Sequence, residues 1–228
     1  LQTCGFVYLT YLGEGRGRAV GDILTQPALG RLFEAIAVSG PGVFFKVDKV
    51  VLKLVATDSY RLAEKTIKLK TPVEFETSSL IPARTVSELG KLLSKCSEKD
   101  VEINFSKNQV LIKANNIELT SRLIEGKFPD YEKIIPKDSR SGAEVSVEEL
   151  MLVVKRVSLF ARENNNNIKL AVTNDGILQL STEETKVGEE KAEISIKMTG
   201  ENNKIALNSQ YLLDVLTFVS ESKINLGI

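Results

Sequence analysis

The sequence predicts an α+β protein in which one kind of domain occurs twice in tandem. Three observations lead to this fold class. Several segments alternate apolar and polar residues, as strands do. Two helical segments with apolar stripes, LIPARTVSELGKLL at 80–93 and IALNSQYLLDVLTFV at 205–219, can be aligned with each other. A length of 228 residues leaves room for two such domains, each with its own core.

The first repeat is predicted to contain a buried strand, a helix and a meander of three strands. VLKLVATD at 51–58 is apolar and rich in β-branched residues, as expected for a strand. The segment 79–95 is predicted to be helical, with Thr85 as N-cap and Glu88 completing a capping box. Its apolar stripe consists of Leu89, Leu92 and Leu93. Alternation predicts three further strands, at 101–106, 109–115 and 117–124.

The second repeat has its predicted elements in the same order. A helix at 146–164 opens with a capping box formed by Ser146 and Glu149. Its predicted buried face consists of Leu150, Met151, Val154 and Val157. Strands are predicted at 168–175, 177–184 and 192–198. A second helix at 208–220 has Asn208 as N-cap. Its inward face is predicted to hold Leu212, Leu213, Val215, Leu216 and Val219.

The two repeats differ at their ends. The segment 223–228 corresponds to the first strand of the meander, so the second repeat is expected to lack the two strands that follow it. Upstream of the first repeat, ALGRLFEAIAVSG at 28–40 is a compressed counterpart of the 146–164 helix. The chain is therefore expected to be a fragment at both ends.

Overall charge and cysteine content restrict the class of protein. Thirty basic residues balance thirty acidic ones, so no global charge points to a nucleic acid or a membrane. Cys4 and Cys96 show no paired spacing, which suggests a reducing compartment. No apolar run reaches the roughly 18–20 residues of a membrane span, and the first residues lack the basic region of a signal peptide. A cytoplasmic location with no membrane partner is expected.

The chain contains no histidine, which argues against catalysis and against a metal site. The usual general base at neutral pH and the commonest zinc ligand are both missing. Two carboxylate pairs, Glu183 with Glu184 and Glu189 with Glu190, lie in the polar stretch 181–193, which has the character of a solvated turn or edge. GEGRG at 13–17 fits neither a P-loop nor a dinucleotide fingerprint. We therefore expect no catalytic residue, no metal and no cofactor.

Basic residues are unevenly distributed over the predicted helices. Arg84, Lys91 and Lys95 fall on or near one exposed face of the first helix. Lys155 and Arg162 are seven residues apart on the second. Such residues usually lie on an ordinary solvated face. If the repeats arranged their helices around a common centre, however, these side chains would line a channel that holds nucleic acid through its phosphates, without reading sequence.

Five segments carry a resemblance to a known family. They are ATDSYRLA (56–63), LIPARTVSELGKLL (80–93), SRLIEGKFPDYEKIIP (121–136), VKRVSLFARENNNNIKL (154–170) and NSQYLLDVL (208–216). Together they resemble the second and third domains of the bacterial sliding clamps, the beta subunits of the replicative DNA polymerase. The segments follow the family's order, and the resemblance covers about residues 41–228.

The resemblance implies the DNA clamp fold, in which antiparallel sheets lie outside and helices line the inner face. In that family, three repeats per chain pair head to tail into a homodimeric ring around duplex DNA. The implied organisation is a divergent segment at 1–40 with a remnant of the middle domain's first helix, a middle domain at 41–127, a linker at 128–143 and a truncated C-terminal domain at 144–228. The family's first domain and its last strand have no counterpart, and Gly40 stands near where a leucine would be expected.

The resemblance also implies a pocket that binds short linear motifs. Pro129 follows Phe128 in the linker, Pro129 and Pro136 flank Tyr131, and prolines limit the entropy lost when a peptide binds. The implied pocket residues are Thr57, Ser59, Tyr60, Arg61, Leu62, Pro129, Lys133, Ile134, Asn208 and Tyr211. An extended peptide with a leucine or phenylalanine anchor would fit such a site. A plain strand–turn–strand corner is the structural alternative for 56–63.

Two further surfaces follow from the resemblance. Arg84 is implied to contact DNA phosphates, and helix geometry adds Lys91, Lys95, Lys155 and Arg162. Leu159 and Phe160 match the position where the third domain meets the next subunit, although both could equally be core residues. The implied partners are double-stranded DNA of any sequence, the replicative polymerase catalytic subunit, the clamp loader and repair proteins.

Two other functions stay open at this point. One is a peptide-binding scaffold that does not encircle DNA, in which the basic residues have no role. The other is an α+β enzyme that uses carboxylates, although the sequence shows no converging acid pair. Peptide binding without retention on closed circular DNA would favour the scaffold, and a pH–rate profile would favour the enzyme.

Overall fold

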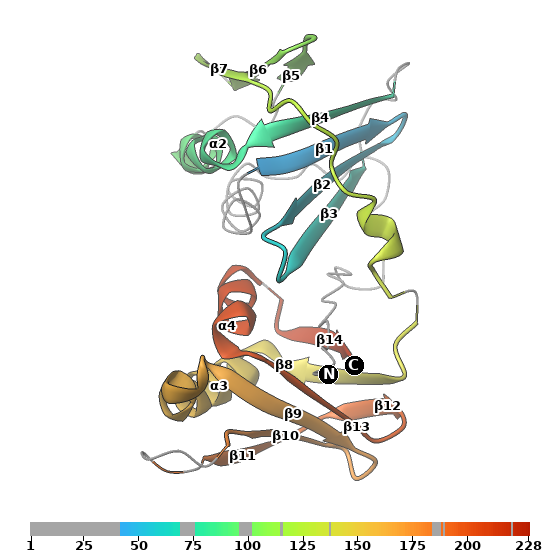
Figure 1. The fold of residues 1–228 in the computed structure, drawn as a ribbon, viewed down its shortest axis with the longest axis vertical. Coiled ribbons are helices and arrows are strands. Elements are labelled where there is room, and N and C mark those ends of the chain that lie inside the picture. The colour runs from blue at the N-terminus through green and yellow to red at the C-terminus, as the bar shows by residue number, and fades with distance from the viewer. Residues whose placement is uncertain are drawn as a thin grey trace. The chain divides into compact units, whose positions relative to one another are not determined.

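The described residues form two compact units. The computed structural model describes residues 42–68, 76–95, 102–114, 116–136, 138–183, 188, 190–219 and 221–228. We call residues 42–131 the first unit and residues 132–228 the second unit, and we describe each by itself (Figure 1). The predicted N-terminal segment 1–40, with its helix remnant, lies outside the described residues.

The first unit is built on a four-stranded antiparallel sheet in the order β3-β2-β1-β4. Its strands are β1 (Gly42–Asp48), β2 (Val51–Thr57), β3 (Leu62–Lys68) and β4 (Thr77–Pro82). Alternate residues of β1 and β2 face the core, where Phe45 and Leu54 are fully buried. The strand predicted at 51–58 is confirmed as β2 (Val51–Thr57), in which Leu52, Leu54 and Ala56 face the core while the β-branched residues lie on the outer face.

Helix α2 (Ala83–Lys95) packs on the core face of this sheet. Val86, Leu89 and Leu93 are buried in the same cluster as the strands, so the predicted stripe is confirmed for the two leucines. Leu92, also predicted to lie on the stripe, is only partly buried. The stripe follows the 3.6-residue period that places residues three and four apart on one face.

The predicted start of α2 is wrong. Residues 79–82 belong to β4, which pairs with β1 as far as Pro82 and buries Ile81 completely. The helix then begins at once, so Thr85 lies inside it, and its hydroxyl oxygen is 2.8 Å from that of Ser121. Glu88 accepts a hydrogen bond from Lys91 Nζ at 3.0 Å. Strand pairing and burial therefore outweigh the local capping preference of the Thr85–Glu88 sequence.

The meander predicted after α2 is confirmed. Strands β5 (Glu102–Phe105), β6 (Gln109–Ala114) and β7 (Ile117–Arg122) form a three-stranded antiparallel sheet in chain order. Val110 and Ile112 of β6 are buried in the cluster that contains α2. The meander thus contributes to the core of the first unit.

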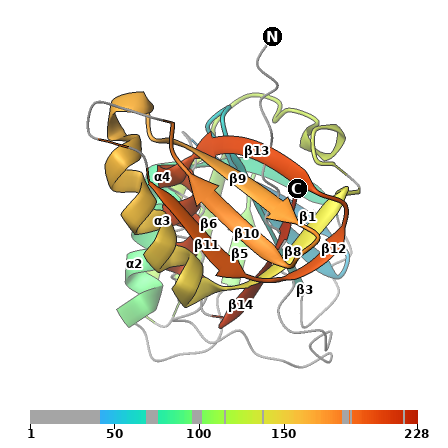
Figure 2. The same cartoon turned by 90° about the horizontal axis from the view of Figure 1, so that it is seen from below.

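The second unit repeats the plan of the first. Its larger sheet has the order β11-β10-β9-β13, and a smaller sheet has the order β12-β8-β14 (Figure 2). The strands are β8 (Ser141–Ser146), β9 (Asn167–Thr173), β10 (Ile177–Ser181), β11 (Lys191–Ser195), β12 (Lys197–Gly200), β13 (Asn203–Asn208) and β14 (Lys223–Gly227). In both units the strand order is third, second, first, fourth, and a helix follows the fourth strand. This shared order supports the internal duplication seen in the sequence.

The single strand predicted at 192–198 is wrong. The segment divides at Ile196 into β11 and β12, which belong to different sheets. The N–H of Ile196 donates to Gly176 O at 2.8 Å, outside the ladder between β10 and β11. Alternation along the sequence continues across this point, so the change of sheet leaves no signal in the pattern.

Both helices of the second unit have the predicted N-caps. Helix α3 (Val147–Ala161) begins after Ser146, whose Oγ accepts from the N–H of Glu149 at 3.4 Å. Helix α4 (Ser209–Phe218) begins after Asn208, whose Oδ1 accepts from the N–H of Gln210 at 2.8 Å. Short 3-10 turns, Tyr131–Lys133 and Arg162–Asn164, follow the aromatic segment and α3.

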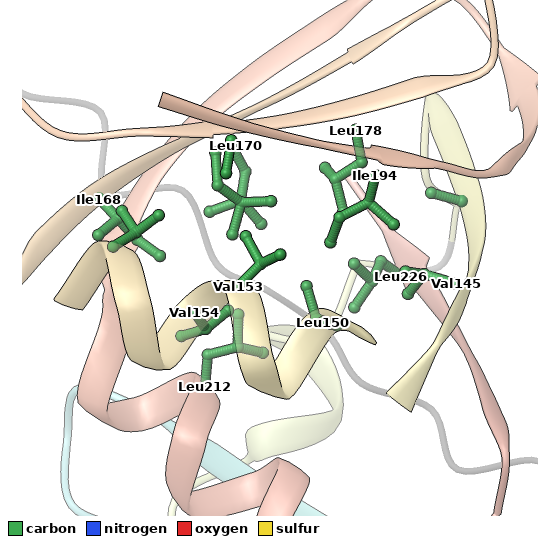
Figure 3. Packing of buried hydrophobic residues seen from close by; sticks show 14 of the residues in the cluster. Val145, Leu150, Val153, Val154, Ile168, Leu170, Leu178, Ile194, Leu212 and Leu226 are labelled. Carbon is green, nitrogen blue, oxygen red and sulfur yellow. The ribbon is translucent and has the colours of Figure 1, made fainter. Parts of the chain in front are cut away.

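Helix α3 lies between α4 and the larger sheet of the second unit. Leu150, Val153 and Val154 point into a cluster with Leu170 and Leu178 of the sheet (Figure 3). Leu212 and Leu216 of α4 complete it, while the predicted inward residues Leu213 and Val219 are partly buried against it. Antiparallel sheets with helices packed against them confirm the predicted α+β class. None of the helices in the described part of the chain is long and apolar enough to cross a membrane.

We expect Leu150→Ala to destabilise the second unit by about 2–5 kcal/mol, because it removes a fully buried side chain and leaves a cavity. Leu152→Ala is the matched control, since Leu152 lies on the same helix but is 65 % exposed. Its effect should stay within about 0.5 kcal/mol. Urea unfolding of both variants measures the difference, and equal effects would contradict the packing of α3.

Candidate functional site

The ten candidate pocket residues are divided between the two units. The first unit contains Thr57, Ser59, Tyr60, Arg61, Leu62 and Pro129, and the second contains Lys133, Ile134, Asn208 and Tyr211. Five of the first group lie in the turn between β2 and β3 or in the two strand residues that flank it, Thr57 and Leu62, so the structure brings these five together. Each group is described within its own unit.

The turn between β2 and β3 is held by hydrogen bonds at both of its ends. Thr57 Oγ1 donates to Arg61 O at 2.8 Å and accepts from the N–H of Ser59 at 3.2 Å. Thr57 and Leu62 face each other as the last pair of the ladder. The turn is therefore an ordered structure and not a loose connection.

Asp58 is the residue of this turn that sequence reasoning missed. Its Oδ1 accepts from the N–H groups of Tyr60 and Arg61, each at 3.0 Å, and its Oδ2 accepts from Arg61 Nε at 3.0 Å. An aspartate that ends a predicted strand and precedes an arginine by three residues is a signal for such an Asx turn, and it could have been found in the sequence.

The contacts of Asp58 change its pKa. Partial burial is the largest single influence and acts to raise the pKa. The N–H groups of Tyr60 and Arg61, and then the guanidinium of Arg61, together outweigh burial, so the pKa of Asp58 is lowered from its ordinary value. Asp58 is therefore a carboxylate at neutral pH, paired with Arg61.

Tyr60 projects from this turn into solvent. Its side chain is 75 % exposed, the largest exposure among the bulky apolar side chains of the described residues. The preceding residue, Ser59, has φ of +75°, a conformation that is uncommon for residues other than glycine. An exposed aromatic ring on a constrained turn is typical of a binding surface.

The aromatic segment of residues 123–131, which we call the strap, crosses the outer face of the same sheet. The N–H of Ile124 donates to Leu80 O of β4 at 2.8 Å. Farther along, the Phe128 ring stacks on Phe44 of β1, with ring centroids 4.8 Å apart and planes at 7°. Buried Tyr131 meets Phe128 edge-on at 6.0 Å. These contacts hold the strap, which includes Pro129, against the sheet, and Figure 1 shows this segment crossing the strands.

Strand register places the strap and the turn on one face of the first unit. Phe44 pairs with Val55 across the ladder, and paired residues of antiparallel strands point to the same face. Thr57 lies two residues after Val55 and pairs with Leu62, so both share that face. Val55 is fully buried there although it does not belong to the core cluster with α2. The turn and the strap therefore form neighbouring parts of one surface.

The four candidates of the second unit lie in two places. Lys133 ends the short 3-10 turn, and Ile134, which follows it, is 52 % exposed. Asn208 caps α4, and its Nδ2 donates to Asn165 O at 3.1 Å, which ties the helix start to a left-handed turn. Tyr211 is half-buried, three residues farther along α4.

The basic candidates are exposed on helices or just after them. Arg84 and Lys91 are exposed on α2, seven residues and therefore about 10.5 Å apart along its axis. Lys91 is paired with Glu88. Lys155 is exposed on α3, and Arg162 is exposed in the 3-10 turn after it. The side chain of Lys95 lies outside the described residues.

Leu159 and Phe160, at the end of α3, differ in burial. Leu159 is 56 % exposed, whereas Phe160 is partly buried. Leu152, which sequence reasoning did not single out, is exposed seven residues earlier and hence on the same helix face as Leu159. Among the described residues, nothing covers the Leu159 side chain completely, so a partner protein could contact it.

The described carboxylates of the polar stretch 181–193 are engaged in ion pairs. Glu183 accepts from Lys169 Nζ at 2.8 Å and from Asn164 Nδ2 at 3.2 Å, and the bond from Lys169 is the main cause of its lowered pKa. Glu190 lies 2.9 Å from Arg156 Nε. Their neighbours Glu184 and Glu189 lie outside the described residues. Where the structure describes the chain, no group of three or more acidic, histidine or cysteine side chains could hold a metal ion.

Comparison with known proteins matches almost the whole described part of the chain. Family models described as the central domain and the C-terminal domain of the DNA polymerase III beta subunit match residues 39–130 and 132–228. The beta sliding clamp of Bacillus subtilis is 34% identical over 188 residues, which are 82% of this chain and 50% of that protein. The beta sliding clamp of Staphylococcus aureus is 33% identical over 184 residues, which are 80% and 48%.

A solved structure supports the same similarity. The crystal structure of the DNA polymerase sliding clamp from Bacillus subtilis has a TM-score of 0.83 and 29% identity. The match covers 90% of this chain and 57% of that chain. The chain thus spans about half the length of the curated relatives that it matches.

Substitution of Phe128 by Ala should release the strap. We expect the first unit to lose about 2 kcal/mol of stability, because the ring's buried area and its stacking on Phe44 are both removed. The N–H of Ile124 should also exchange with solvent faster, as measured by NMR. Tyr60→Ala, which removes an exposed ring of the same unit, should change stability by less than about 0.5 kcal/mol. An unchanged exchange rate of the Ile124 N–H in Phe128→Ala would contradict the claim that Phe128 holds the strap on the sheet.

Proposed function

The chain belongs to the DNA polymerase III beta subunit family, and from that premise we propose that it acts as a DNA sliding clamp. A clamp encircles duplex DNA and tethers the replicative polymerase and other replication and repair proteins. The observation that carries the proposal is the match of both family domains, in order, to two units with the same strand order. The proposed role is that of a non-catalytic accessory subunit that works in the cytoplasm.

The proposed contact with DNA is electrostatic. Arg84, Lys91, Lys155 and Arg162 are exposed on or directly after helices, as residues that meet phosphates without reading bases must be. Lys95 is proposed for the same role from its place on α2. The full-length form is proposed to close as a homodimer, with Leu159 and Phe160 at the contact between subunits. Exposure of Leu159 supports this role.

The proposed contact with protein partners is a short linear motif. The polymerase catalytic subunit, the clamp loader and repair proteins are the proposed sources of such motifs. In the first unit, exposed Tyr60 and the strap residue Pro129 lie on elements that share one surface with Thr57 and Leu62. Lys133, Ile134, Asn208 and Tyr211 of the second unit are proposed as further residues that contact such a motif. An apolar anchor, leucine or phenylalanine, suits this set.

The double variant Tyr60→Ala with Pro129→Ala should weaken the binding of an extended, leucine- and phenylalanine-anchored peptide by roughly tenfold or more. The reason is the loss of an exposed aromatic contact and of a backbone constraint at the strap. Fluorescence anisotropy of a labelled peptide measures the change. Val50→Ala removes an exposed apolar side chain from the β1–β2 turn and serves as the control. Identical titration curves for the wild type, the double variant and Val50→Ala would contradict a peptide-binding site in the first unit.

The clamp proposal predicts that the protein, loaded in its full-length form, is retained on closed circular DNA and released when the DNA is cut. Gel filtration of protein with circular or linearised plasmid measures this retention. Charge reversal at Arg84 and Lys155 should reduce loading and its dependence on salt, because fewer phosphates are contacted. Peptide affinity should not change in that variant. Lys107→Glu, in the β5–β6 turn, is the control for net charge.

The second candidate is a peptide-binding scaffold that does not encircle DNA. The ordered turn and strap of the first unit would serve either function, and the similarity to beta sliding clamps does not favour the scaffold. Peptide binding without retention on either form of the plasmid would select the scaffold over the clamp.

A further inference from the structure

We infer that Asp58 is a positioning residue, which holds the turn between β2 and β3 in the shape that an incoming peptide meets. The inference rests on the proposed peptide-binding function. Asp58 is not among the residues that the resemblance implies, and its carboxylate points back into the turn. Its role would be to organise Tyr60 and Arg61 rather than to touch the peptide.

The contacts of Asp58 converge on two consecutive residues. One oxygen, Oδ1, accepts from the N–H groups of both Tyr60 and Arg61, and the other accepts from the Arg61 side chain, all at 3.0 Å. Hydrogen bonds to an ionised acceptor are roughly twice as strong as those between neutral groups. A single carboxylate thereby restrains the backbone of Tyr60 and Arg61 and the direction of the Arg61 side chain.

The position of Tyr60 depends on this backbone more than on packing. Tyr60 is 75 % exposed, so few protein atoms surround the ring, and the φ and ψ angles of the turn set the direction of its Cα–Cβ bond and hence the region that the ring can reach. Ser59 has the left-handed φ of +75°, which an unrestrained chain would rarely adopt. Thr57 Oγ1 restrains only the N–H of Ser59 and the carbonyl of Arg61. The N–H groups of Tyr60 and Arg61 are instead restrained by Asp58 Oδ1.

A turn that is already ordered binds a peptide with a smaller loss of entropy. Immobilising a flexible loop on binding weakens affinity, and a preformed loop avoids that loss. The strap provides the same advantage on the neighbouring part of the surface, since Phe128 is stacked on Phe44. Asp58 would thus preorganise the turn just as the aromatic stack preorganises the strap.

Two substitutions of Asp58 separate its two oxygens. Asp58→Ala removes every side-chain acceptor. Asp58→Asn keeps a neutral oxygen at Oδ1 for the two N–H groups, and it loses the negative charge and the acceptor for Arg61 Nε. We expect affinity for a fluorescein-labelled, leucine- and phenylalanine-anchored peptide to fall about tenfold in Asp58→Ala, as loss of one to two hydrogen bonds predicts. Asp58→Asn should stay within about threefold of the wild type. Asp175→Ala, in the β9–β10 turn, should bind normally and is the matched control.

Amide exchange reports on the turn independently of any peptide. In Asp58→Ala, the N–H groups of Tyr60 and Arg61 should exchange faster, while that of Ile124 in the strap should not change. A global loss of structure would accelerate all three. Exchange confined to the turn, combined with rescue by Asp58→Asn, therefore supports positioning and not general destabilisation.

The outcomes separate this inference from the proposed function. Wild-type affinity in Asp58→Ala, with weak binding by Tyr60→Ala, would overturn the inference and leave the peptide-binding function in place. Equal losses in Asp58→Ala and Asp58→Asn would overturn the role given to Oδ1. If the wild type does not bind the peptide, the proposed function fails. Unchanged exchange at Tyr60 and Arg61 in Asp58→Ala would then overturn the inference as well, and faster exchange would support the control of the turn by Asp58.

Discussion

Each unit depends on the pairing of its first large strand with partners on both sides. β1 pairs with β2 and β4, and β9 pairs with β10 and β13, always antiparallel. This pairing brings the fourth strand beside the first. In the first unit, α2 follows β4, returns over the sheet and buries its apolar stripe there. In the second unit, α3 covers the sheet, and α4, which follows β13, buries its apolar stripe against α3. Burial of these stripes then stabilises the pairing, because neither a sheet nor an amphipathic helix can hide its apolar face alone.

The same strand pairing also determines which side chains the outer face of the first unit's sheet presents. Because alternate residues point to opposite faces, the register that buries Phe45 and Leu54 beside α2 turns Phe44, Val55 and Thr57 outward. Phe128 of the strap covers part of this outer face. The turn between β2 and β3, which Asp58 holds in shape, lies at the end of the face. A shift of one residue in register would exchange the two faces and destroy both the core and the candidate binding surface.

Local chemistry explains which elements could be predicted from the sequence. The caps at Ser146 and Asn208, the apolar and β-branched content of β2 and the alternation of β5, β6 and β7 involve only neighbouring residues, and these predictions are confirmed. The start of α2 and the division of 192–198 depend on partners far away in the chain, β1 and β8, so local patterns did not reveal them. Asp58 shows the opposite case. Its contacts span only three residues and were available to sequence reasoning, whereas the roles of the ten pocket residues came from the family resemblance and stay predictions.

The proposed function connects these features: helices with exposed basic residues for DNA, and an ordered, partly apolar surface for peptides. Its central claim is that partners bind where the turn and the strap meet. A crystal structure of the chain with an extended, leucine- and phenylalanine-anchored peptide tests this claim most directly. We predict that the peptide contacts Tyr60 and Pro129, with the Asp58 hydrogen bonds unchanged. A peptide bound solely to other surfaces, or a turn rebuilt around it, would contradict the account.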